Sequence, residues 1–202
     1  MRASLAIAGL IGFLASTAPA LADDDLMSSF QTLCLANHGE NTAVIAAATQ
    51  AGWMPLPASL LANLSKSPMF AEPSGLMRTS NTAIQILILS HTVTSPFANV
   101  QAKICAVAVV GQKLDITAQV AALAGVPVIK DNGLDLYFWQ DDNGVHKPID
   151  EALVQTNSAE MKALLETGKV NVLATQTDDS MSMVFLMVPY KEPEPSPLPN
   201  PQ

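Results

Sequence analysis

The residues from Val100 to Gly111 form a run of apolar and β-branched side chains with polar residues only near its start. In a strand, Ala102 and Ile104 face one way, whereas Cys105 and its alternate neighbours face the other. Apolar side chains on both faces are typical of a strand that is covered on both sides of its sheet. The pattern therefore predicts an interior strand that carries Cys105 on a buried face.

Before this strand, apolar residues recur with the period of a helix. The first such stretch places four of them at positions i, i+4, i+7 and i+8, namely Leu26, Phe30, Leu33 and Cys34. This spacing predicts a helix with Cys34 on its buried side, ending in Asn37-His38-Gly39. Similar patterns predict further helices at about 40–51, 58–64, 115–124 and 157–168. Asn157 and Glu160 resemble a capping box, which predicts that the last of these helices starts at Asn157.

The remaining periodic stretches predict strands, which gives seven stretches in all at 69–79, 82–94, 100–111, 134–140, 145–149, 170–177 and 181–188. Asp142-Asn143-Gly144 is a strong tight-turn signal between two of them. Helices that precede strands, with two further helices inserted, indicate an α+β fold. We expect one largely antiparallel sheet of five to seven strands, with the N-terminal helices and the two inserted helices packed on it.

The two ends of the chain differ from its middle. Residues 1–22 combine Arg2, an apolar segment and the small residues of Ala20-Leu21-Ala22, which is the pattern of a secretory signal peptide cut before Asp23. An uncleaved membrane anchor is the alternative, but the apolar segment is short for a span. Residues 191–202 include five prolines and predict an extended, disordered tail. We therefore expect a single domain at 23–190, exported to the periplasm or the medium.

Composition narrows the classes of partner. The formal net charge is −8, with 10 Lys and Arg residues against 18 Asp and Glu residues. Such an acidic chain lacks the basic patch that nucleic acids and anionic membranes attract. We therefore expect no nucleic-acid partner and no stable membrane insertion after signal cleavage. No P-loop and no G-x-G-x-x-G fingerprint occurs in the mature chain, so no cofactor is predicted.

The chain contains two cysteines, Cys34 and Cys105. Both occupy core-facing positions, and export would bring them into an oxidising compartment, which predicts one structural disulfide. A redox-active or metal-binding thiol pair is the alternative, although the chain has no Cys-x-x-Cys motif. The disulfide would join the first helix to the interior strand.

Methionine spacing raises a metal hypothesis. Met181 and Met183 alternate in a predicted strand, and a Met-x-Met pair is a plausible soft site for Cu(I). The same residues also form one apolar face of the strand, and methionine commonly fills gaps in aliphatic cores. The core interpretation is favoured, so no metal is predicted and the two methionines remain the candidates.

Catalytic motifs are absent in their common forms, including G-x-S-x-G and H-E-x-x-H. His91 follows Ser90 directly in a strand, so the two side chains point to opposite faces and cannot form a nucleophile–base pair. A site assembled from distant residues would draw on His91, Asp141 or His146. We treat these three residues as the candidates for catalysis.

Three segments carry a resemblance at the level of pattern: Phe30-x-x-x-Cys34, Ala47-Ala48 leading to Gly52-Trp53, and Ile104-Cys105-Ala106-Val107. Together with the N-terminal pattern, this layout resembles small uncharacterised exported proteins of Gram-negative bacteria. The resemblance supports the disulfide and implies no activity.

Most polar residues are accounted for by caps, turns and surface, so a non-enzymatic domain that binds a protein or small ligand is the leading hypothesis. A periplasmic hydrolase is the first alternative, and a periplasmic copper-binding protein is the second.

Overall fold

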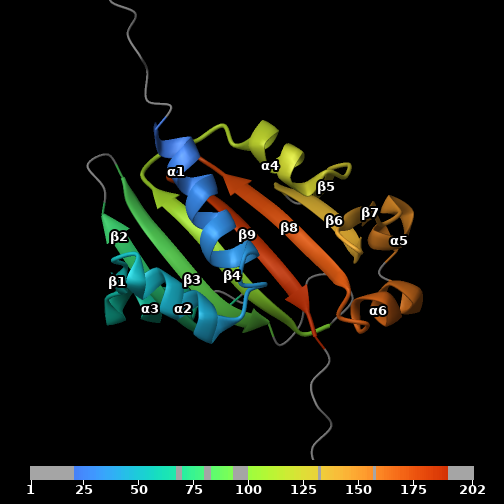
Figure 1. The fold of residues 1–202 in the computed structure, drawn as a ribbon, viewed down its shortest axis with the longest axis horizontal. Coiled ribbons are helices and arrows are strands. Elements are labelled where there is room, and N and C mark those ends of the chain that lie inside the picture. The colour runs from blue at the N-terminus through green and yellow to red at the C-terminus, as the bar shows by residue number, and fades with distance from the viewer. Residues whose placement is uncertain are drawn as a thin grey trace, which may run out of the picture.

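The computed structural model describes residues 21–66, 70–79, 83–92, 100–131, 133–156 and 158–190. Within these residues the chain forms one antiparallel sheet of nine strands with helices on both faces (Figure 1). The predicted α+β class and the largely antiparallel sheet are confirmed. Most of the predicted signal peptide 1–22, the predicted tail 191–202 and Asn157 lie outside the described residues.

The strands are β1 (Met54–Pro55), β2 (Ala71–Thr79), β3 (Ile84–Thr92), β4 (Ala102–Val110), β5 (Ile129–Asp131), β6 (Leu134–Asp142), β7 (Val145–Pro148), β8 (Val170–Thr177) and β9 (Met181–Pro189). The helices are α1 (Leu21–Phe30), the π-helical turn η1 (Gln31–Leu35), α2 (Asn41–Gln50), α3 (Ala58–Leu64), α4 (Thr117–Ala124), α5 (Glu151–Gln155) and α6 (Ala159–Leu165). The strand order is β1-β2-β3-β4-β9-β8-β6-β5, and β7 also pairs with β6.

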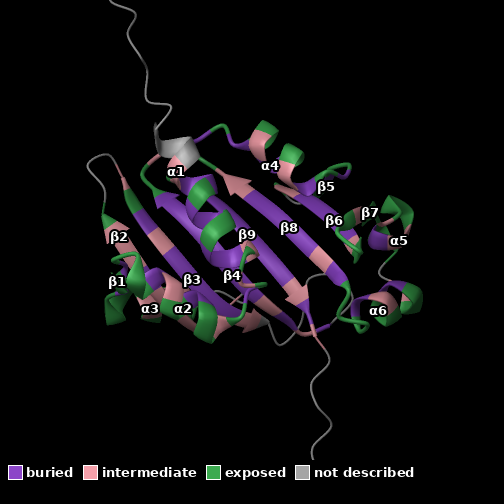
Figure 2. Cartoon of the chain, in the orientation of Figure 1, coloured by how far each residue is buried: buried purple, intermediate pink, exposed green. Residues whose placement is uncertain are grey.

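Strand β4 is interior, as its sequence predicts. It pairs along its whole length with β3 on one side and β9 on the other, so that Cys105 lies between Leu89 and Leu186. Side chains on both faces of β4 are buried, and the central strands are buried along most of their length (Figure 2). The continuous apolar run of this strand therefore reflects cover on both sides of the sheet.

The two faces of the sheet carry separate cores. We call the face that bears Cys105 and Leu186 the cysteine face, and α1, η1, α2 and α4 pack against it. The opposite face bears Met183 and Phe185; we call it the methionine face, and α5 and α6 contribute to its core. Strands β3, β4, β6, β8 and β9 thus supply both cores through alternate residues.

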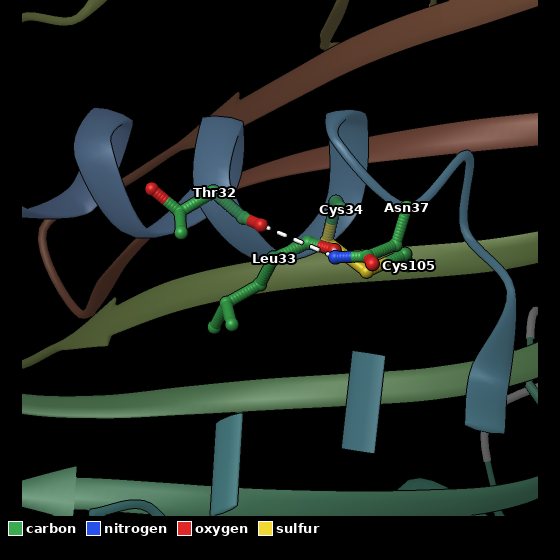
Figure 3. Close-up of a disulfide and its surroundings, with 5 residues drawn as sticks. All are labelled: Thr32, Leu33, Cys34, Asn37 and Cys105. Carbon is green, nitrogen blue, oxygen red and sulfur yellow. Dashed lines mark hydrogen bonds between the residues drawn. A yellow bond between two sulfur atoms is a disulfide. The ribbon is translucent and has the colours of Figure 1, made fainter. Parts of the chain in front are cut away.

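The first helix is held to the sheet as predicted. Leu26, Phe30, Leu33 and Cys34 are all buried. Cys34 and Cys105 form a disulfide with a Cα–Cα distance of 5.5 Å, which confirms the predicted pair (Figure 3). The Asn37 side-chain amide donates to the carbonyl oxygens of Thr32, at 3.2 Å, and of Leu33, at 2.9 Å. It thereby satisfies carbonyl groups at the end of η1 that have no partner within the helix.

Three details differ from expectation. The sheet has nine strands instead of five to seven, because the structure adds β1 and β5, which are two and three residues long. Such strands are too short to show a period in the sequence. Helix α5 was also not expected. Finally, Ser158 caps α6, and its hydroxyl accepts from the Met161 N–H at 3.1 Å.

Candidate functional site

Two of the three sequence candidates lie side by side on the cysteine face. Asp141 in β6 and His146 in β7 are direct partners across the strand pair, and Trp139 precedes them on the same face. The tight turn at Asn143-Gly144 sets this register, since both residues have positive φ values, of 55° and 81°. The hairpin therefore presents a carboxylate and an imidazole together.

His91, the third candidate, lies elsewhere. Its Nε2 is 3.7 Å from Glu72 Oε2, and it lines a separate small pocket with Glu40, Lys103 and Tyr190. The Lys103 ammonium already forms an ion pair with Glu40 there. The structure thus brings Asp141 and His146 together and leaves His91 apart from them.

Asp141 and His146 open onto a pocket of about 280 Å³. Nine residues from η1, the loop after it, α4 and four strands line this pocket: Leu35, His38, Leu123, Trp139, Asp141, His146, Asn171, Leu173 and Leu186. Five of the lining residues are apolar or aromatic, and the other four are polar: His38 from the loop, Asp141 and His146 from the hairpin, and Asn171 from β8. The volume lies just below the usual range for ligand sites, which run from about 300 to 1,000 Å³.

His38 joins this pocket although the sequence did not nominate it. It follows η1, where its N–H donates to the Leu35 carbonyl at 3.0 Å, and its φ is 48°. Gly39 continues the turn so close to the sheet that an added Cβ would lie 3.8 Å from the Cys105 Cβ. The disulfide at Cys34 therefore fixes the loop that delivers His38. The four-residue spacing from Cys34 is the signal that could have found it.

The orientation of His146 is set from two sides. Its ring stacks on Trp139 with a centroid separation of 4.7 Å and an interplanar angle of 26°. Its Nδ1 is 2.7 Å from the carbonyl oxygen of Ala124, the last residue of α4. Because a carbonyl oxygen only accepts, Nδ1 carries the proton in this bond. Nε2 is then the ring atom that remains for a ligand.

The two neighbouring aspartates have different surroundings. Asp141 Oδ1 accepts the Gly144 N–H at 2.9 Å, which closes the turn. Asp142 points to the methionine face and forms an ion pair with Lys147. A hydrogen bond from Lys147 lowers the pKa of the Asp142 carboxyl below its usual value. Asp141 alone of the pair lines the pocket.

Many covalent hydrolases use a hydroxyl or thiol nucleophile. No serine, threonine or cysteine occurs among the described residues that line it. Across the described part of the chain, no group of three or more histidine, cysteine, aspartate or glutamate residues is placed to hold a metal ion. The arrangement offers two imidazoles, one carboxylate and one amide above a leucine-rich floor.

The candidate copper ligands lie on the other side of the sheet. Met183 is buried in the core of the methionine face and Met181 is half-buried beside it. His91 and His146 are on the cysteine face, so the structure does not place either histidine next to the methionines. Both methionines pack as parts of the aliphatic core.

A second polar cluster connects α1 to the edge of the sheet. Arg78 Nη2 donates to Asp25 Oδ1 at 2.7 Å, to Gln85 Oε1 at 2.8 Å and to Ser29 Oγ at 3.1 Å. The guanidinium carbon also lies 5.1 Å from the centre of the Trp53 ring, within the range of a cation–π contact. These contacts tie the arginine to α1 through Asp25 and Ser29, which indicates a structural role.

The fold and the pocket define an α+β domain whose disulfide-anchored first helix completes a small site on one face of an antiparallel sheet. Comparison with protein-family models, with curated proteins and with solved structures finds no match. No helix within the described residues is long and apolar enough to cross a membrane.

Proposed function

We propose that the protein is a non-enzymatic binding domain that holds a small molecule in the pocket between His38 and His146. The observation that carries this proposal is the convergence of four polar side chains on an apolar floor: His38, Asp141, His146 and Asn171. Apolar pockets with a few convergent polar groups are the usual form of ligand sites.

The rigidity of the pocket supports binding. Three of its lining residues, Trp139 in β6, Leu173 in β8 and Leu186 in β9, are buried. Strand β8 lies between the other two and pairs with each of them along most of its length. The loop that carries His38 forms another wall, and it begins within four residues of the disulfide-bonded Cys34. A site formed in advance loses little conformational entropy when its ligand binds, which favours affinity even for a small contact area.

The proposal also includes export. The pattern of residues 1–22 and the buried Cys34–Cys105 disulfide both fit a protein that folds in the periplasm or outside the cell, because disulfides persist in oxidising compartments. The resemblance to small exported proteins of Gram-negative bacteria points the same way. A periplasmic location would expose the pocket to small solutes.

Trp139 provides a direct test of binding, because its indole forms part of the pocket wall. We expect members of a library of small water-soluble molecules to shift the indole N–H signal of Trp139 in NMR spectra. Leu123 is half-buried at the rim, so Leu123→Trp should fill the pocket and weaken binding by about tenfold or more, which corresponds to about 1.4 kcal/mol.

Leu60→Trp is the matched control, because Leu60 is exposed on α3 and does not line the pocket. It should leave every affinity unchanged. The binding proposal fails if no compound shifts the Trp139 signal, or if Leu123→Trp binds as tightly as the wild-type protein.

A hydrolase is the second candidate, and the direct pairing of Asp141 with His146 favours it. In such an enzyme, His146 Nε2 would act as a general base on water. His146→Asn removes this atom but keeps an N–H that can reach the Ala124 carbonyl. If the protein is the binding domain that we propose, the wild-type protein and the His146→Asn variant should hydrolyse p-nitrophenyl acetate at the same rate. A rate that falls at least about a hundredfold in the variant would favour the enzyme.

A further inference from the structure

We propose that the ligand of this pocket is a small organic cation, namely a primary amine with an apolar body. This inference rests on the proposed binding function and names the chemical class that the site selects. Two independent features carry it: the hydrogen-bonding character of the Asp141–His146 pair and the balance of charge among the lining residues.

Two of the four polar side chains of the pocket, Asp141 and His146, offer acceptors to a ligand. An ionised Asp141 can only accept, and its carboxylate keeps further lone pairs beyond the bond from Gly144. His146 donates through Nδ1 to Ala124, so its Nε2 is an acceptor while the ring is neutral. These two acceptors stand on directly opposed residues of the hairpin. A ligand with several N–H donors on one atom is the best match for them.

The charge of the pocket points the same way. Neither lysine nor arginine is among its nine lining residues. Lys169 stands across from Asp141, whose N–H donates to the Lys169 carbonyl oxygen at 3.4 Å, but it does not line the pocket. Lys147 forms its ion pair with Asp142 on the opposite face of the sheet. An anionic ligand would therefore meet the Asp141 carboxylate with no lysine or arginine among the lining residues to offset it. The net charge of −8 would also steer cations toward the protein and anions away from it.

The apolar body of the ligand is indicated by the floor. The floor is lined by Trp139 and four leucines, namely Leu35, Leu123, Leu173 and Leu186. These side chains offer no hydrogen bond, so a strongly hydrated molecule would lose water there without replacement. A single ring or a short branched chain that carries an ammonium group satisfies both ends of a pocket of about 280 Å³.

Three probes with the same ring test the class: 2-phenylethylamine, 2-phenylethanol and 3-phenylpropanoate. Each is titrated at pH 7.5, where the amine is a cation, while the Trp139 indole signal is recorded. We expect the amine to bind at least about tenfold more tightly than either other probe, since its ammonium forms a charge-assisted hydrogen bond. In Asp141→Asn this preference should disappear.

Asp141→Asn should fold normally, because the asparagine oxygen can still accept the Gly144 N–H. Asp142→Asn is the matched control: it removes the same charge one residue away, on the opposite face, and should change amine affinity less than about twofold. A second measurement needs no variant. Raising the salt concentration should weaken binding of the amine and leave binding of the alcohol unchanged.

The results separate this inference from the function on which it rests. If the alcohol or the carboxylate binds at least as tightly as the amine does, the cation class is wrong and the binding function stands. Equal loss of amine affinity in Asp141→Asn and Asp142→Asn would also overturn it. If neither the three probes nor the library shifts Trp139, the binding function itself fails.

Discussion

Replacing both Cys34 and Cys105 by alanine is expected to lower the free energy of unfolding by about 4 kcal/mol. The disulfide spans a sequence separation of 71 residues, and a cross-link over so long a loop removes much of the entropy of the unfolded chain. Urea unfolding of the oxidised wild type, the reduced wild type and the double variant measures this difference. The two forms without the bond should unfold at similar, lower urea concentrations.

The same variant should also weaken ligand binding, which distinguishes it from a change that affects stability alone. The His38 loop follows the bond by four residues, and Gly39 lies against Cys105. Without the cross-link the loop has more conformational freedom, so ordering it around the proposed ligand costs more entropy and lowers the affinity. Unchanged urea midpoints would contradict the stabilising role of the disulfide, and two free thiols in protein purified without reductant would contradict its formation.

Much of the fold could be predicted because long elements carry their own period. The runs at 100–111 and 181–188 are apolar on both faces, and the structure places both in the middle of the sheet. Turn chemistry was equally informative at Asp142-Asn143-Gly144. The short strands β1 and β5 escaped prediction because two or three residues cannot display an alternation, and their pairing depends on tertiary contacts.

In the candidate site, too, the residues linked by a local turn could be placed from the sequence, whereas those brought together by tertiary packing could not. Asp141 and His146 flank a two-residue turn, so the sequence alone places them opposite each other once the hairpin is recognised. His38 comes from a helix end that only tertiary packing brings to the hairpin. Asn171 is distant in sequence and reaches the hairpin because β8 pairs with β6, where it is the register partner of Trp139. His91 failed as a partner because it lies near the far end of β3, beside Glu72.

The largest effect of a single side chain is expected at Phe185 on the methionine face. Its relative exposure is 1 %, and its register partners are Ala106 on β4 and Ala174 on β8. The two small neighbours leave room on the methionine face for the phenylalanine ring, which belongs to the core there. Phe185→Ala should therefore create a cavity and lower the free energy of unfolding by about 3–5 kcal/mol, measured by urea unfolding.

Phe185→Leu is the graded control, since it keeps most of the apolar volume and should destabilise by less than half as much. Both variants should retain the Trp139 signal and the affinity of the pocket at low temperature, because Phe185 and the pocket lie on opposite faces of the sheet. The disulfide variant should lose stability and affinity together, whereas the Phe185 variants should lose stability alone. A loss below about 1 kcal/mol in Phe185→Ala would show that the methionine face is not closely packed around this ring.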